Sequence, residues 1–182
     1  MNGFNPIKIV NKFPSKHKIL SEKFSQFGNF LPIASIDLGP FGVNEIIHII
    51  FTFLDPENKE LKFITKGDNV DVFGFEILPG GLYLPSFEPS SLRITSLFDS
   101  TFSSFLEKSE LIRNSNIDLA KSIEYTEEPE WWQWDQTPLN SRGRKMKYFC
   151  HVELDDILKR WERLYIFFDS EDKIVKTIYQ RT

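Results

Sequence analysis

The residues with the most unusual side chains are gathered in one short segment, Pro129–Pro138. It holds three of the four tryptophans of the chain and an acid next to them: Trp131, Trp132, Trp134 and Asp135. In an extended segment, successive side chains point to opposite faces, so both faces would carry an indole. One face would join the core, and the other could stack against a base, a sugar or a partner's side chain. Tryptophan is more often buried than functional, so both interpretations stay open.

A basic loop comes directly after this segment. Four positive charges fall within six residues around the turn glycine Gly143: Arg142, Arg144, Lys145 and Lys147. Aromatic residues beside basic ones are typical of grooves for single-stranded nucleic acid. The whole chain, however, has a formal net charge of -4, and nonspecific nucleic-acid affinity depends on neutralising phosphates with Lys and Arg. We therefore expect a solvated hairpin tip and no nucleic-acid partner.

Motifs for metal binding or nucleophilic catalysis are missing from the sequence. The histidines His17, His48 and His151 stand far apart, and no paired His or Cys spacing of a metal site occurs. Cys150 and His151 are neighbours, and neighbours on a strand face opposite ways, so we expect a buried thiol and a partly exposed imidazole. Phosphate-binding loops, dinucleotide fingerprints and nucleophile elbows do not occur either. The sequence predicts no catalytic residue, no metal and no cofactor, which favours a protein that is not an enzyme.

Length and composition indicate one domain over residues 1–182. A chain of 182 residues buries roughly 70% of the surface that its unfolded form exposes, and 18 phenylalanines predict an aromatic core. The single cysteine excludes an internal disulfide and fits a reducing compartment. The first residues show no charged leader with a long apolar stretch after it. The sequence therefore predicts a cytoplasmic protein without a membrane partner.

A repeated pattern is the clearest sign of the fold. Copy one spans about residues 31–65 and copy two about residues 147–180. The first strands of the copies align at an offset of 116, and Ile50–Ile64 lies over Leu164–Ile178 at an offset of 114 without a gap. Each copy is expected to form a strand, a connection, a strand, an acidic turn and a third strand. Any two hairpins share much of this pattern, but an acid-Leu pair at matched positions favours duplication within one pseudo-symmetric domain.

The rest of the chain divides into a lead segment, residues 1–30, and a connecting region, residues 66–146. The lead segment is rich in lysine, is interrupted by prolines, and reads as irregular or weakly strand-like. Elsewhere the periodicity predicts two strands, a helix and a second, short helix: Val70–Leu78, Leu82–Leu84, Ser96–Ile112 and Asp155–Trp161. The predicted fold class is α+β, with pseudo-symmetric duplicated β-hairpin units forming one or two antiparallel sheets and with few helices.

The tryptophan segment also carries a family resemblance. Four stretches contribute to it: Pro129–Pro138, Met146–Phe149, Leu164–Phe168 and Tyr179–Gln180. Together they resemble the YwqG-like family of bacterial proteins of unknown function. The resemblance implies an α+β fold of two similar halves and, for some members, a role as an immunity or interaction protein. It supplies no catalytic residues, and the chain departs from the family at Ser35 and His151, where the family tends to have Gln.

Two functions of different classes remain as hypotheses. The first is a non-enzymatic protein-binding or immunity-type protein that uses the Trp131–Asp135 face and the acidic segment Asp99–Glu130 against a basic partner such as a toxin. The alternative is a small-molecule or carbohydrate-processing enzyme with a pocket between the two halves, lined by the indoles and by Glu153 or Asp155. The candidate binding residues are Trp131, Trp132, Trp134, Asp135, Arg142 and Arg144.

Overall fold

The computed structural model describes residues 6–181, so the first five residues of the lead segment and Thr182 lie outside the described part. The strands are β1 (Lys8–Lys12), β2 (Phe30–Asp37), β3 (Ile46–Thr52), β4 (Val72–Ile77), β5 (Tyr83–Pro85), β6 (Ile123–Glu124), β7 (Lys147–Glu153), β8 (Glu162–Asp169) and β9 (Ile174–Arg181). The α-helices are α1 (Lys16–Ile19), α2 (Glu22–Ser25), α3 (Asp99–Arg113), α4 (Leu119–Ser122) and α5 (Leu154–Leu158), and two 3-10 turns are η1 (Gly39–Phe41) and η2 (Pro89–Leu92).

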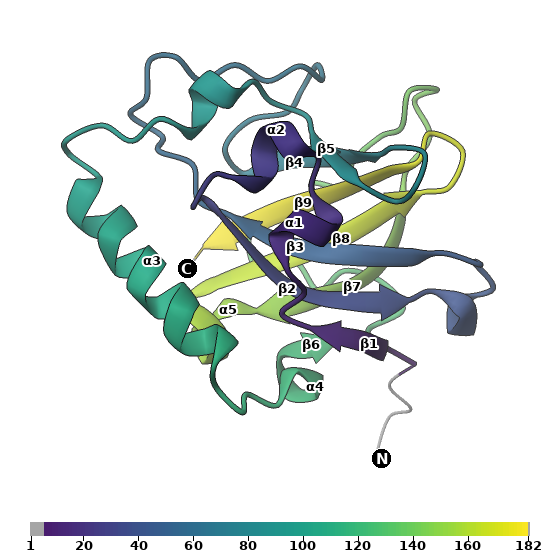
Figure 1. The fold of residues 1–182 in the computed structure, drawn as a ribbon. Coiled ribbons are helices and arrows are strands. Elements are labelled where there is room, and N and C mark those ends of the chain that lie inside the picture. Colours follow the sequence, from purple (N-terminus) through teal and green to yellow (C-terminus); the bar gives the residue numbers. More distant parts are fainter. Residues whose placement is uncertain (1–5, 182) are drawn as a thin grey trace.

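Two antiparallel sheets pack face to face around one aromatic core. The smaller sheet has the order β1-β2-β3 and the larger one the order β5-β4-β9-β8-β7-β6. Figure 1 shows the smaller sheet in front of the larger, with α3 along one side of both. Across the interface, the ring centroids of Phe51 and Tyr179 are 5.7 Å apart, and those of Phe41 and Phe149 are 5.2 Å apart. The predicted α+β class with few helices is confirmed.

A β-bulge occurs at the same place in both copies of the repeat. The register between β2 and β3 shifts at Ile33, and the register between β7 and β8 shifts at Phe149, which preserves the sequence offset of 116. Next to the bulges, Ile50 and Phe167 hold equivalent places in the second strands, an offset of 117 where the sequence alignment gives 114. The matched bulges therefore show which residues of the two second strands correspond. The sequence alignment, which follows the turns, differs from this correspondence by three residues.

Copy one lacks its predicted third strand, which corrects the sequence interpretation of Leu61–Ile64. This segment forms only an isolated bridge, between Phe63 and Phe87. Its backbone is held by the loop that contains η2, because Lys62 N donates a hydrogen bond of 2.8 Å to Ser91 Oγ. Copy two does form the predicted hairpin, and β8 and β9 pair along their whole length.

Within residues 6–181 no strand pairs with the outer side of β3, which is therefore an edge strand of the smaller sheet. Side chains from the larger sheet take up two of its backbone donors. His48 N donates to the Tyr83 hydroxyl at 2.8 Å, and Thr52 N donates to the Tyr179 hydroxyl at 3.0 Å. Buried amide groups need such partners, so the two tyrosines replace part of a missing neighbour strand.

The predicted helices are present with small changes at their ends. Of the apolar residues whose spacing predicts the helix over Ser96–Ile112, Phe105 and Ile112 are buried in α3, together with Ser109. The short helix α5 ends at Lys159, whose φ of 54° reverses the chain direction before β8. The lead segment is more regular than predicted, since β1 and two short helices form within its described part.

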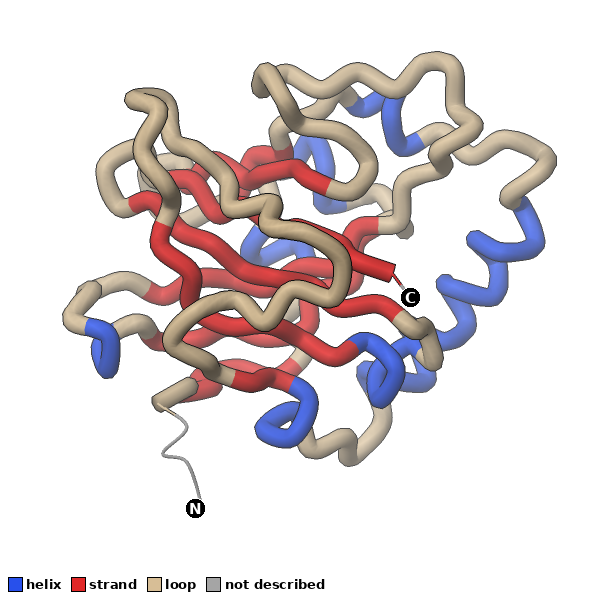
Figure 2. The backbone as a smooth tube through the Cα atoms, turned by 180° about the vertical axis from the view of Figure 1, so that it is seen from behind, coloured by secondary structure: helices blue, strands red, loops and turns tan. Residues whose placement is uncertain are grey.

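A long loop between β6 and β7 crosses the outer face of the larger sheet, as Figure 2 shows. Beneath it lies a second, smaller core made mainly by side chains of β7, β8 and β9: Met146, Tyr148, Tyr165, Phe167 and Ile178. Trp131 of the loop packs against this cluster. The larger sheet is therefore covered on both faces, by the smaller sheet on one side and by the loop on the other.

Candidate functional site

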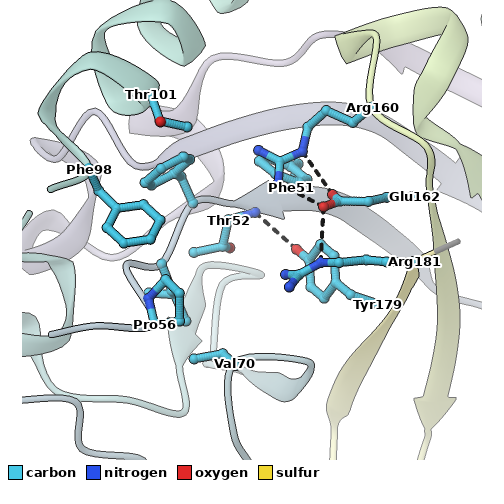
Figure 3. A pocket seen from close by; sticks show the side chains of 12 residues that line it. Phe51, Thr52, Pro56, Val70, Phe98, Thr101, Arg160, Glu162, Tyr179 and Arg181 are labelled. Atoms are coloured by element: carbon cyan, nitrogen blue, oxygen red, sulfur yellow. Dashed lines mark hydrogen bonds and ion pairs between the residues drawn. The ribbon is translucent and has the colours of Figure 1, made fainter.

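A cleft of about 200 Å³ opens between the two sheets, at the end where β3 stops and β8 begins (Figure 3). Its lining is formed by Phe51, Thr52, Phe53, Leu54, Pro56, Val70, Phe98, Thr101, Arg160, Glu162, Tyr179 and Arg181. Copy one supplies the residues up to Pro56, and copy two supplies Arg160, Glu162 and Tyr179. The cleft therefore lies between the two halves, although the tryptophans, Glu153 and Asp155 do not line it as the enzyme hypothesis predicted.

An ion cluster forms the polar end of the cleft. The Glu162 carboxylate accepts hydrogen bonds from Arg160 Nε at 2.9 Å and from Arg160 Nη2 at 2.7 Å, and Arg181 Nε lies 3.0 Å from Glu162 Oε1. The Glu162 side chain is only 7% exposed, whereas the two guanidinium groups reach solvent. A carboxylate this deeply buried needs paired cations, and here it has two.

A hydroxyl group without a partner lies beside this cluster. Thr52 is buried at the end of β3, and its Oγ1 has no hydrogen-bond partner among the described residues. Its backbone N–H is occupied, since it donates to the Tyr179 hydroxyl. Burial raises the pKa of Tyr179 above its usual range, so this hydroxyl stays protonated at neutral pH. The Thr52 oxygen has less than 1 Å² of accessible surface, so this hydroxyl is closed off from the cleft and its lack of a partner costs stability.

Aromatic and aliphatic side chains form the other walls. Phe51 separates the core from the ion cluster, and the Arg160 guanidinium carbon lies 5.4 Å from its ring centroid. Phe98 and Thr101, at the start of α3, close the side opposite Arg160 (Figure 3). Pro56, in the acidic turn of copy one, completes the wall. The arrangement joins an apolar surface to a polar end in which Glu162 and Asp71 balance the charges of Arg160 and Arg181.

Sequence reasoning missed the charged residues of the cleft, although β8 contains a usable signal. Side chains two residues apart on a strand share a face, so Glu162 lies on the same face as Leu164 and Ile166, which belong to the main core. An acid on the core face of a strand needs a buried partner or a function. The same alternation places Arg181 on the face of Tyr179, at the end of β9.

The tryptophan segment is not extended, so the predicted alternation of its faces is wrong. Bends occur at Trp132 to Trp134, and the three indoles have three different environments. Trp131 packs on Tyr165 with centroids 4.5 Å apart, and the Arg163 guanidinium carbon lies 4.6 Å from the ring centroid of Trp132. Trp134 is 62% exposed. The structure thus places Trp131 in the smaller core and leaves Trp134 at the surface.

Gln180 of β9 holds this segment on the sheet. Its Oε1 accepts hydrogen bonds from Trp132 N at 2.9 Å and Gln133 N at 3.1 Å. Its Nε2 donates to Trp134 O at 2.9 Å and to Gln136 Oε1 at 3.1 Å. Gln180 is fully buried, and these four contacts satisfy its whole amide. The residues of this segment and of β9 that carry the family resemblance therefore bind each other and hold the loop on the sheet.

The other candidate binding residues are surface groups engaged with neighbours. Asp135 accepts hydrogen bonds from Thr137 N at 2.8 Å and Thr137 Oγ1 at 2.6 Å, which lower the pKa of its carboxyl. Arg142 and Arg144 both pair with Glu171 in the turn between β8 and β9. All three side chains are more than half exposed. The basic loop is thus fastened to an acidic turn and keeps little positive charge free, which agrees with a solvated hairpin tip.

His151 is fully buried, which corrects the prediction of a partly exposed imidazole. The bulge at Phe149 places Tyr148 and His151 on the same outer face of the sheet, where the Tyr148 hydroxyl lies 2.8 Å from His151 Nδ1. Cys150 belongs to the inner core, so the two neighbours do face opposite sides. Burial raises the pKa of the Cys150 thiol far above its usual range, and this group is no nucleophile.

The other ring nitrogen of His151 has no hydrogen-bond partner among the described residues. Carboxylate oxygens of Glu153 and Glu124 lie 3.6 and 3.7 Å from it. Burial, aided by the positive charge of Arg163, lowers the pKa of His151 to about 4. Arg163 also pairs with Glu153, which places this acid on the outer face and away from the cleft. The imidazole is neutral at pH 7 and closed off beneath the β6–β7 loop.

Residues 6–181 contain no feature that fits a membrane or a metal ion as a partner. No helix there is long and apolar enough to cross a membrane. No group of three or more His, Cys, Asp or Glu side chains in that range could hold a metal ion.

Comparisons with protein-family models, with curated proteins and with solved structures give no match to this chain. The resemblance to the YwqG-like family therefore stays a prediction, and the geometry of the cleft is the basis for any statement about function.

Proposed function

We propose that this protein is a non-enzymatic binding protein whose ligand occupies the cleft between the two sheets. The observation that carries the proposal is the lining of the cleft, which joins apolar side chains of copy one to the paired charges of Arg160, Glu162 and Arg181. The cleft between copy one and copy two is also where a duplicated fold offers residues from both halves.

The state of the ionisable groups supports binding without catalysis. Both oxygens of Glu162 are taken by Arg160, and Arg181 adds a third contact, so this carboxylate is fully engaged within the protein. The Tyr179 hydroxyl is held protonated by burial and already accepts the Thr52 amide. Histidine, cysteine and lysine are not among the lining residues. The lining favours recognition of a ligand over its chemical conversion.

A mapping experiment tests this proposal. A mixture of small fragments that covers anions, cations and neutral rings is added to isotope-labelled protein, and backbone chemical shifts are followed by NMR. We expect perturbations to cluster at Phe51–Leu54, Thr101 and Arg160–Glu162. Thr101→Trp, which fills the mouth of the cleft, should abolish them, whereas Ser104→Trp on the exposed face of α3 should leave them unchanged. Fragments that bind elsewhere, or not at all, would overturn the proposal.

A protein partner is the second candidate function, and the exposure of Trp134 favours it. The indole is 62% exposed, yet its backbone is fixed by Gln180, so little entropy would be lost when a partner covers it. Glu127 and Glu128 are exposed in the same loop and would suit a basic partner such as a toxin.

Capture of a partner from native lysate by the unaltered protein, together with its loss in Trp134→Ala, would support this candidate. Equal capture by both proteins, or by neither, would count against it. Trp161→Ala is a matched control, because Trp161 is also exposed, at 73%, and lies outside the β6–β7 loop.

A further inference from the structure

The β6–β7 loop, residues 125–146, lies on the outer face of the larger sheet and is fastened there by side chains of β8 and β9 (Figure 2). The Tyr165 hydroxyl donates to Glu130 O at 2.7 Å, and Arg163 Nη1 donates to the same carbonyl at 2.9 Å. Gln180 adds the four contacts described above. The main core lies on the other face of the same strands. The loop can therefore separate from the sheet without opening the main core.

A buried imidazole, that of His151, lies under this loop. Its Nδ1 is 2.8 Å from the Tyr148 hydroxyl, and its Nε2 has no hydrogen-bond partner among the described residues. The titratable groups that face the ring are Glu124 from β6, Tyr148 and Glu153 from β7, and Arg163 and Tyr165 from β8. Within residues 6–181 no acid of the loop pairs with the ring. The loop thus covers the imidazole without balancing a charge on it.

The closed arrangement does not accommodate a second proton on the ring. The carboxylates near Nε2 favour hydrogen on that nitrogen, so in the neutral ring Nδ1 accepts from Tyr148. A proton on Nδ1 would force this hydroxyl to turn its hydrogen toward Thr126 Oγ1, which is 3.5 Å away. Glu153 is already paired with Arg163, and the charge of Glu124, whose side chain is 55% exposed, is screened by solvent. Burial accordingly lowers the pKa of the ring to about 4.

Arg163 connects the charge of the ring to the loop. Its guanidinium pairs with Glu153, donates to Glu130 O of the loop and lies 4.6 Å from the ring centroid of Trp132. An imidazolium at His151 would repel this guanidinium and compete with it for Glu153. The proton on the ring therefore weakens one of the contacts that fasten the loop.

From this cluster we infer that the β6–β7 loop is an acid-released cover: when His151 takes up a proton, the loop lifts from the outer face of the larger sheet and water reaches the imidazolium. Lifting the loop also uncovers the smaller core, which includes the rings of Tyr148, Tyr165 and Phe167. The cleft lies between the two sheets, on the other face, so this device goes beyond the proposed function.

Proton linkage gives the size of the effect. The ring has a pKa of about 4 under the loop and regains the ordinary 6.5 when the loop is lifted. The equilibrium constant for opening should therefore rise about 20-fold between pH 7 and pH 5. The amides of Trp132 and Gln133, which Gln180 binds, report this opening, because they exchange with solvent only when the loop leaves the sheet.

Amide hydrogen exchange of the unaltered protein, measured by NMR at both pH values and corrected for the chemical exchange rate, tests the inference. We expect exchange at Trp132 and Gln133 to quicken about 20-fold at pH 5. At both pH values these amides should exchange at least about tenfold faster than those of β8, because the sheet stays closed. Exchange at the rate of β8, or a rate that does not change with pH, would overturn the inference. Neither result depends on a variant.

Two matched variants identify the histidine. His151→Gln keeps a polar side chain under the loop that cannot titrate, so the pH response of Trp132 and Gln133 should be lost. His48→Gln removes the titrating ring of β3, in the smaller sheet, and should leave that response unchanged. A response that persists in His151→Gln would overturn the inference. A response that is lost in His48→Gln would do so too, because it would tie the opening of the loop to general unfolding.

Discussion

The two copies of the repeat differ in the path of the chain after their second strand. In copy two the chain turns at Asp169 and returns along β8 as β9, which completes a hairpin. In copy one the chain turns at Asp55 and leaves β3 without a neighbour on that side. The turns themselves are alike, because in both an aspartate Oδ1 accepts the amide of the residue two positions later at 2.9 Å. The same local turn therefore leads to two different tertiary structures.

The second oxygen of each aspartate shows where the difference arises. Asp169 Oδ2 accepts a hydrogen bond from Asn140 in the basic loop, whereas Asp55 Oδ2 accepts two from Thr95, its N–H and its hydroxyl, both at 2.7 Å. The loop before α3 thus draws the first turn away from β3. This leaves the end of β3 beside the ends of β8 and β9, and the cleft forms where a third strand would otherwise pack.

The largest expected effect comes from removing the two turn aspartates. Asp55 is fully buried and accepts three hydrogen bonds, so Asp55→Ala should lower the free energy of unfolding by about 4 kcal/mol. Asp169 is partly exposed, so Asp169→Ala should lower it by about 2 kcal/mol. Urea denaturation of both variants measures the difference. Equal losses of stability in the two variants would show that the hydrogen bonds from Thr95 do not cause the difference between the two copies.

Two histidines, the half-buried His48 of copy one and the buried His151 of copy two, should give the next largest effect. His48 and His151 both have a pKa lowered to about 4 from the ordinary 6.5, mainly by burial. As the pH falls, the imidazoles of the unfolded chain take up a proton near pH 6.5, whereas those of the folded protein do so only near pH 4. The free energy of unfolding therefore has its full value above pH 6.5 and falls progressively between pH 6.5 and pH 4. For His151, with its side chain 1% exposed, the free energy of unfolding should fall by about 2 kcal/mol between pH 7 and pH 5.

The groups around each imidazole differ, and this difference allows a control. His48 meets Ser35 Oγ at 2.9 Å, whereas His151 faces the carboxylates of Glu124 and Glu153. Denaturation of His151→Gln at both pH values should show a smaller pH dependence than the unaltered protein. Imidazole NMR titration reads each pKa directly, and a His151 value at or above 6.5 would contradict the prediction.

The tyrosines that cap β3 provide a third way to test the comparison. Tyr179→Phe and Tyr83→Phe should each cost about 1.5 kcal/mol, because each leaves a buried amide of β3 without an acceptor. Hydrogen exchange should quicken at Thr52 in the first variant and at His48 in the second. The amides of β8, which lie in a ladder with β9, should keep their protection. Equal changes in β8 and β3 would mean that the hydroxyls are not local caps.

The smallest expected effect has the opposite sign. Thr52→Val should raise the free energy of unfolding of the unliganded protein by about 1 kcal/mol, because it removes a buried hydroxyl that has no partner in the described chain. Thermal unfolding monitored by circular dichroism measures the shift in Tm. A variant that is less stable than the unaltered protein would show that the Thr52 hydroxyl is already satisfied in the folded protein.

Much of the fold could be predicted because its signals are local. Apolar runs identify β3 and β8, alternation identifies β9, the repeat identifies β7, and helical spacing identifies α3. Whether Leu61–Ile64 forms a strand or a loop could not be predicted in this way, because its residue pattern suits both a hairpin and a loop. The choice depends on contacts with Ser91 and Thr95, about 30 and 40 residues from their partners.

The cleft was harder to predict than the fold. Glu162 and Arg181 are cross-strand partners in β8 and β9, and Thr52 of β3 comes beside them only when the two sheets pack. The tryptophans are conspicuous because they are rare and adjacent, yet Trp131 fills a core and Trp132 lies against Arg163. The informative signal is the acid at Glu162, placed in phase with the buried residues of β8.

The edge of β3, which the two tyrosines cover, has a consequence for aggregation. Ile46–Thr52 reads Ile-Ile-His-Ile-Ile-Phe-Thr, a seven-residue segment with high β-propensity, no charge, no proline and no glycine. Such segments assemble into intermolecular cross-β structure when their edges are free. In the native protein the edge faces the larger sheet and two tyrosine hydroxyls. Separation of the two sheets would release this strand, so partial opening, well before complete unfolding, is the step at which the protein becomes prone to aggregate.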